Sequence, residues 1–181
     1  MNIKDNPDSL GHSLRIGNAG LVLLNPYLPT LFEKLGLLIK TDAGRHRIPD
    51  GESLSRAVHL LQYCVGASRV SSEAELALNK LLCGHSTAQP IAPSITAAKA
   101  DLDVCDQLLH AAAASWAALR ETSLASLRET FLQREGLLQL RDGRWTLQVQ
   151  RNTLDVLIDQ IPWNFSVIYH PWMINPIHVT W

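Results

Sequence analysis

The hydrophobic pattern of this chain changes its period near residue 136, from steps of three or four residues to alternation. Between residues 138 and 148 apolar and polar side chains alternate on both sides of Asp142-Gly143, a dipeptide typical of a two-residue hairpin turn. This turn pairs Arg141 with Arg144 and continues outward one residue at a time. The sequence therefore predicts an antiparallel hairpin, whose apolar face consists of Leu138, Leu140, Trp145 and Leu147.

Upstream of the hairpin, the apolar residues have helical spacing. Pro26 and Pro29 divide the first helical stretch into two short helices, because proline removes a backbone donor and disfavours helix at the preceding residue. Thr96 and Thr122 are candidate N-caps for two later helices, and Gly136 is a candidate end for the second. We expect helices within residues 20–38, 52–65, 72–82, 97–119 and 123–135.

The last thirty residues contain one further helix and two extended runs. Asn152 or Thr153 can cap a short helix that Pro162 ends, and residues 165–169 and 177–181 can join the hairpin in a small antiparallel sheet. The sequence thus predicts an α+β fold with a mainly helical body and a C-terminal sheet. We expect a flexible tail at residues 1–14 and one domain at 15–181, helical over 20–135 and sheet-forming over 136–181.

Composition argues against several classes of partner. The 16 Lys and Arg balance 17 Asp and Glu without a block of like charge, so a nucleic-acid surface is not expected. No apolar run approaches the ~20 residues of a membrane span, and residues 1–10 lack the apolar core of a signal peptide. We therefore expect a cytoplasmic protein whose three separate cysteines are reduced thiols: Cys64, Cys83 and Cys105.

Candidates for catalysis or metal binding are few. Cys83 and His85, with His59 from another helix, could form a thiol nucleophile with a base, but they supply too few ligands at an unusual spacing for zinc. Asp155 and Asp159 lie four residues apart on one helix and could act as an acid and base, although a solvated face is the commoner arrangement. We predict no catalytic residue, metal, cofactor or small-molecule substrate.

Tryptophans suggest a protein-binding surface instead. Four of the five lie between residues 145 and 181. Trp163 and Trp172 adjoin prolines and Trp181 ends the chain, where full burial is harder to achieve, and tryptophan is common in interfaces. These three and Arg134 are our candidate partner-binding residues, with packing inside the domain as the alternative.

Five stretches, in order, resemble the tape measure protein family of contractile injection systems, the phage-tail-like particles of bacteria. They lie at residues 18–29, 56–61, 78–84, 127–136 and 155–163. The resemblance runs from about Ile16 to Trp181. It implies a non-enzymatic component linked to control of tube and sheath length, and it supplies no catalytic residues.

The resemblance also implies a set of partners, and two other functions remain as alternatives. We expect contacts with a baseplate hub, the tube or an assembly factor, in the cytoplasm of the producing bacterium or in the assembled particle. Members that act as rulers are long, and the similarity is to their C-terminal part. This chain is therefore either a terminal module of a longer protein or a short relative that anchors or initiates assembly. The alternatives are a small Cys/His or carboxylate-dependent hydrolase and a stand-alone adaptor domain.

Overall fold

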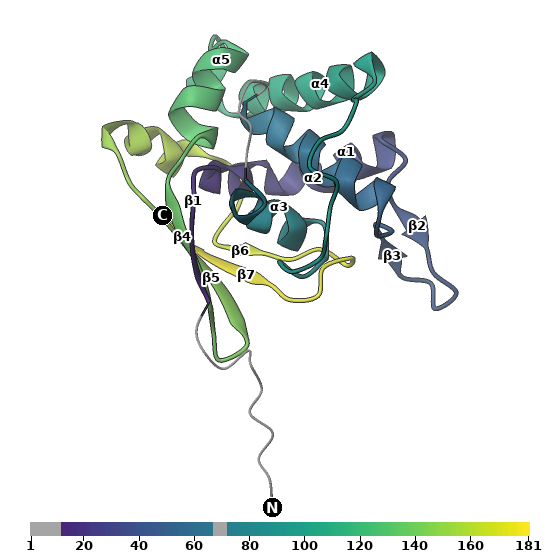
Figure 1. Cartoon of the computed structure of the whole chain (residues 1–181). Helices are drawn as coiled ribbons and strands as arrows, with labels where there is room; N and C mark the ends of the chain where they lie inside the picture. Colours follow the sequence, from purple (N-terminus) through teal and green to yellow (C-terminus); the bar gives the residue numbers. More distant parts are fainter. Residues whose placement is uncertain (1–11, 67–71) are drawn as a thin grey trace, which may run out of the picture.

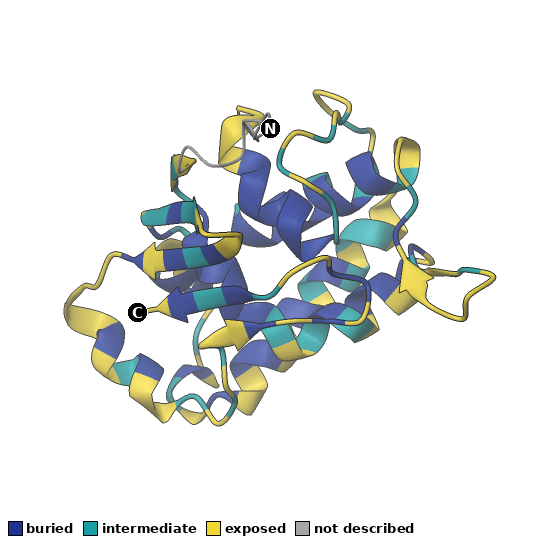
Figure 2. Ribbon diagram, turned by 90° about the horizontal axis from the view of Figure 1, so that it is seen from below, coloured by how far each residue is buried: buried dark blue, intermediate teal, exposed yellow. Residues whose placement is uncertain are grey.

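The computed structural model describes residues 12–66 and 72–181 and has the predicted α+β architecture. Helical elements form a body on one side, and the strands form a sheet along its other side (Figure 1). Figure 2 shows buried residues concentrated in the central helices and in the strands that face them. Among the described residues, none of the helices combines the length and the apolarity that crossing a bilayer requires.

The helical body is more fragmented than its hydrophobic pattern predicts. Pro26 lies inside a 3₁₀ helix and Pro29 in the first turn of the following α-helix, where the missing N–H costs nothing. Neither Thr96 nor Thr122 caps a helix; Ser123 caps α5 by accepting a hydrogen bond from the N–H of Ser126 at 3.2 Å. The helical elements are η2 (Ala19–Tyr27), α1 (Leu28–Lys34), α2 (Glu52–Val65), η3 (Ala74–Leu76), α3 (Ala77–Leu82), α4 (Lys99–Ser115), η4 (Ala117–Leu119), α5 (Leu124–Leu127), the π-helical η5 (Arg128–Leu132) and η6 (Thr153–Gln160).

The predicted hairpin is confirmed with its register. Strands β4 (Gly136–Arg141) and β5 (Arg144–Val149) are antiparallel, with Arg141 opposite Arg144 and Leu138 opposite Leu147. Asp142 and Gly143 both have positive φ, as the two-residue turn requires. Gly136 begins β4 and does not end a helix, since η5 stops at Leu132.

The rest of the sheet differs from the prediction of an all-antiparallel arrangement. Its strand order is β1-β4-β5-β7-β6, and β7 (Ile177–Thr180) runs parallel to β5. Residues 150–176 form the long crossover that a parallel pair needs. They include β6 (Val167–Ile168), which does pair antiparallel with β7.

The N-terminal boundary of the domain also differs. Ser13 and Leu14, which we assigned to the tail, belong to strand β1 (Ser13–Ile16), antiparallel to β4 at the sheet edge. Residues 1–11 of the predicted tail lie outside the described part of the chain. The helical part of the chain also contains strand structure that was not predicted: between the helices expected at 20–38 and 52–65 lies a small ribbon, β2 (Ile39–Lys40) paired with β3 (His46–Arg47).

Candidate functional site

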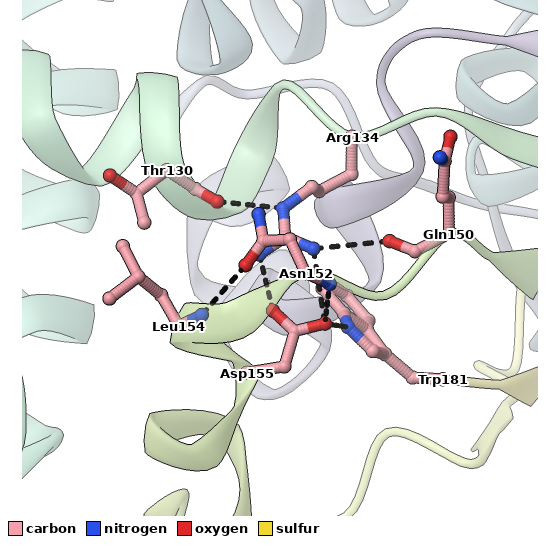
Figure 3. A network of polar contacts seen from close by, with 7 residues as sticks. All are labelled: Thr130, Arg134, Gln150, Asn152, Leu154, Asp155 and Trp181. Carbon is pink, nitrogen blue, oxygen red and sulfur yellow. Dashed lines mark hydrogen bonds and ion pairs between the residues drawn. The ribbon is translucent and has the colours of Figure 1, made fainter.

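Arg134 and Asp155 form a buried ion pair where the helical body meets the C-terminal segment (Figure 3). Arg134 is only 5% exposed, and its guanidinium makes a bidentate contact with the Asp155 carboxylate. The same guanidinium donates to the carbonyl oxygens of Thr130 at 2.7 Å and Gln150 at 3.1 Å. Arg134 was a candidate for partner contact, but its donors serve contacts within the domain.

The chain terminus completes this network. Trp181 donates its indole N–H to Asp155 Oδ2 at 2.8 Å, and its ring lies over the Arg134 guanidinium at 5.4 Å. Asn152 caps η6: its backbone N–H donates to Asp155, and its side chain accepts from the N–H of Leu154 at 3.0 Å. The capping predicted at Asn152 or Thr153 is therefore made by Asn152. One buried carboxylate thus connects Arg134, which follows η5, with the start of η6 and with Trp181.

The ionisation of Asp155 reflects this arrangement. Burial alone raises the pKa of the carboxyl group, but hydrogen bonds from Arg134, from the N–H of Asn152 and from Trp181 outweigh it, so the pKa lies below its usual value. Asp159, four residues on, is exposed. The two carboxylates thus occupy different surroundings, and Asp155 lies on the buried face of η6, contrary to the solvated face that we considered commoner.

The candidate tryptophans bind their own domain through their indole N–H groups. Trp163 donates to the carbonyl oxygen of Leu23 at 3.0 Å, and Trp172 to that of Leu82 at 2.9 Å. Trp172 is 8% exposed, whereas Trp163 and Trp181 are half-buried. The tryptophans therefore fasten the C-terminal segment to the helices, and two of them also remain accessible.

The thiol and imidazole candidates are not arranged as a nucleophile with its base. Cys83 is buried, and burial raises the pKa of its thiol, which disfavours the thiolate. His59 Nε2 lies 2.7 Å from the carbonyl oxygen of Ala92, and His85 Nε2 lies 2.7 Å from that of Ile48. Within residues 12–66 and 72–181, no group of three His, Cys, Asp or Glu side chains is suited to a metal ion.

A buried amide cluster was not predicted from the sequence. Asn18 donates to Gln62 Oε1 at 2.9 Å and to Asn79 Oδ1 at 2.7 Å, and Asn79 donates to the carbonyl oxygen of Val58 at 3.0 Å. Lys80 is also fully buried, with Nζ 2.7 Å from Glu73 Oε1. The available signal was the presence of polar residues within apolar helical stretches.

His170 provides a pH-dependent contact beside Trp172. Its ring stacks on the indole with centroids 4.6 Å apart, and Nε2 lies 2.7 Å from Asn25 Oδ1. Burial lowers the pKa of His170, and the hydrogen bond to Asn25 opposes this shift only in part. The unfolded chain therefore binds more protons at this residue than the folded chain does, and stability must fall on acidification.

We expect the free energy of unfolding to decline as the pH drops below about 6.5, the ordinary histidine pKa. Urea titrations between pH 8 and 5 of the wild type and of His170→Gln measure this contribution. The difference between the two curves cancels the other histidines, and the decline should be shallower in the variant. Parallel curves would show that His170 is not the group responsible.

The stretches that carry the family resemblance meet in the fold. Asn18 in the first contacts Asn79 in the third, and Arg134 in the fourth pairs with Asp155 in the fifth. A family model described as contractile injection system tape measure protein matches residues 2–181. Neither the curated proteins nor the solved structures contain a match.

Proposed function

Because the chain belongs to the contractile injection system tape measure protein family, we propose that it is a folded, non-enzymatic assembly component of a contractile particle. The observation that carries this proposal is the extent of the family match, which includes every described helix and strand. The protein would act through contacts with a baseplate hub, the tube or an assembly factor. It would do so in the cytoplasm of the producing bacterium or within the particle.

The dimensions of the folded domain favour anchoring or initiation over measurement. Its longest helix, α4, has 17 residues and so spans about 25 Å. A globular chain of this size has a radius of gyration of about 16 Å. Length control by this domain would therefore operate through where and when assembly begins, with the distance itself set by another part of the particle.

The outer side of the C-terminal segment is the surface that we propose for partner contact. Trp163 and Trp181 are half-buried there, whereas Trp172 is buried and the Arg134 guanidinium lies inside the domain against the Trp181 ring. Exposed apolar side chains accompany them on the same segment: Leu154, Val156, Val167 and Tyr169. Half-buried aromatic residues flanked by exposed apolar ones suit a protein interface.

Deleting the gene in a producing strain should abolish complete particles or scatter their lengths, and complementation should restore uniform particles. Electron microscopy of purified particles measures both their number and their length. The expected effect follows from the proposed role, because a missing anchor would leave tube and sheath growth without a fixed start. Normal particles of uniform length in the deletion strain would contradict the role and favour the adaptor or hydrolase alternatives.

A further inference from the structure

Residues 39–47 form a two-stranded ribbon that projects from the helical body (Figures 1 and 2). Every residue in it is exposed except Thr41, which is half-buried. The ribbon is not part of the five-stranded sheet, and a two-stranded ribbon alone is marginally stable. It therefore contributes little to the core, and stabilisation of the domain does not explain why this exposed ribbon is present.

The ribbon is nevertheless held in one shape. Leu37 and Ile48 anchor its two ends in the core, and His85 Nε2 lies 2.7 Å from the carbonyl oxygen of Ile48. At the tip, the N–H of Thr41 donates to the carbonyl oxygen of Arg45 at 2.7 Å, and the N–H of Gly44 donates to that of Thr41 at 2.8 Å. A preformed ribbon loses little conformational entropy when it binds.

The ribbon is also basic, although the chain as a whole has a formal net charge of only -1. Lys40, Arg45 and Arg47 outnumber the single carboxylate, Asp42. Across residues 12–66 and 72–181, none of these three cations takes part in an ion pair, whereas other arginines of the chain, such as Arg56 and Arg134, do. Its positive charge is thus directed at solvent and available to a partner.

We propose that the β2–β3 ribbon docks on an acidic surface of a partner protein in the particle. Lys40, Arg45 and Arg47 would pair with carboxylates, and Ile39, which is 42% exposed, would add apolar contact. Three cations beside one carboxylate neutralise too few phosphates to make a strong nucleic-acid site. The proposal rests on the assembly role above and adds the chemistry of the partner.

Charge reversal tests the ribbon directly. Lys40, Arg45 and Arg47 are changed together to glutamate, and the variant complements the deletion strain. The matched control changes three other exposed arginines to glutamate with the same change in net charge: Arg120, Arg141 and Arg144. Circular dichroism and thermal unfolding verify that both proteins fold. We expect at least ten-fold fewer complete particles with the ribbon variant and wild-type numbers with the control.

Photo-crosslinking identifies what the ribbon touches. A photoreactive residue at the ribbon tip, replacing Ala43, is compared with one at Ala114, which is exposed on α4. We expect an Ala43-specific adduct on a particle protein, at a peptide rich in Asp and Glu. The adduct should disappear when the three cations are reversed. An adduct with nucleic acid, a peptide without acidic residues, or no specific adduct would overturn the proposal.

The two experiments separate this proposal from the assembly role. If deletion abolishes particles but the ribbon variant restores them, the ribbon proposal fails and the assembly role stands. If deletion leaves particles normal, the assembly role fails. The crosslink then decides whether the ribbon binds an acidic protein surface, with loss of the adduct on charge reversal required as support.

Discussion

Replacing Arg134 with methionine should destabilise the fold by about 3–5 kcal/mol, the cost of leaving one member of a buried ion pair without its partner. Asp155 would keep hydrogen bonds from Asn152 and Trp181 but lose its only cationic contact within the described residues. The backbone acceptors of Thr130 and Gln150 would also lose their donor. Urea unfolding at pH 7, followed by circular dichroism, measures the loss.

The pH dependence of this variant tests in a second way whether the loss comes from leaving the buried Asp155 carboxylate without its cationic partner. Without Arg134, two of the influences that lower the pKa of Asp155 are lost while its burial remains, so the pKa of the folded variant lies above that of the folded wild type. The folded variant then binds more protons than the folded wild type at acidic pH, and its deficit relative to the wild type should shrink as the pH approaches 4. A deficit that is independent of pH would indicate lost packing of the arginine side chain.

A double variant supplies the control. Arg134→Met with Asp155→Leu removes both charges, and replacing a buried pair with apolar residues is often close to neutral. We therefore expect the double variant to be more stable than the sum of the two single changes implies. A single-variant loss below about 1 kcal/mol would contradict the picture of a desolvated pair and would fit an exposed one.

The sequence-based predictions were accurate where an element depends on residues close together in the sequence, and they failed where it depends on distant ones. The β4–β5 hairpin depends on alternation and on the turn at Asp142-Gly143, both local, and its register was predicted correctly. The direction of β7 depends on how residues 150–176 return to the sheet, and no local pattern encodes that path. Strand β1 was missed because its short segment, Ser13–Ile16, follows a polar stretch and acquires strand structure only by pairing with β4.

The candidate site shows the same limit. Asp155 was placed on a short capped helix, which is a local property. Its partner, Arg134, lies 21 residues earlier across the hairpin, and the sequence gives no sign of their contact. Trp163, Trp172 and Trp181 were singled out as candidates for partner contact, with packing inside the domain as the alternative. Their indole donors, however, found backbone acceptors as distant in sequence as Leu23 from Trp163, and only the fold reveals this.

Changing Gly20 to alanine should cost about 3 kcal/mol, at the upper end of the usual cost of overpacking a core. Gly20 lies in η2, and its Cβ position would be 1.9 Å from the carbonyl oxygen of Phe131 and 2.5 Å from the Cα of Leu132. Both atoms belong to the backbone of η5, so no side-chain rotation relieves the clash. Helical propensity alone would favour alanine by about 0.5–1 kcal/mol, and the contact overrides it.

Gly36→Ala is the matched control. At Gly20 an added Cβ clashes although alanine suits the helix, whereas at Gly36 there is room for a Cβ but the backbone conformation disfavours alanine. Gly36 has a φ of +64° and open space around its Cβ position, so alanine there meets backbone strain without a clash. We expect a loss of about 1 kcal/mol, in line with the penalty for left-handed backbone. Urea unfolding of both variants compares the free-energy cost of the steric clash at Gly20 with that of the backbone strain at Gly36. If Gly20→Ala costs less than Gly36→Ala, η2 and η5 can separate without disturbing the core. If Gly20→Ala costs more, the backbones of η2 and η5 cannot move apart without disturbing the core. Their contact would then be as necessary to the fold as the Arg134 ion pair that follows η5.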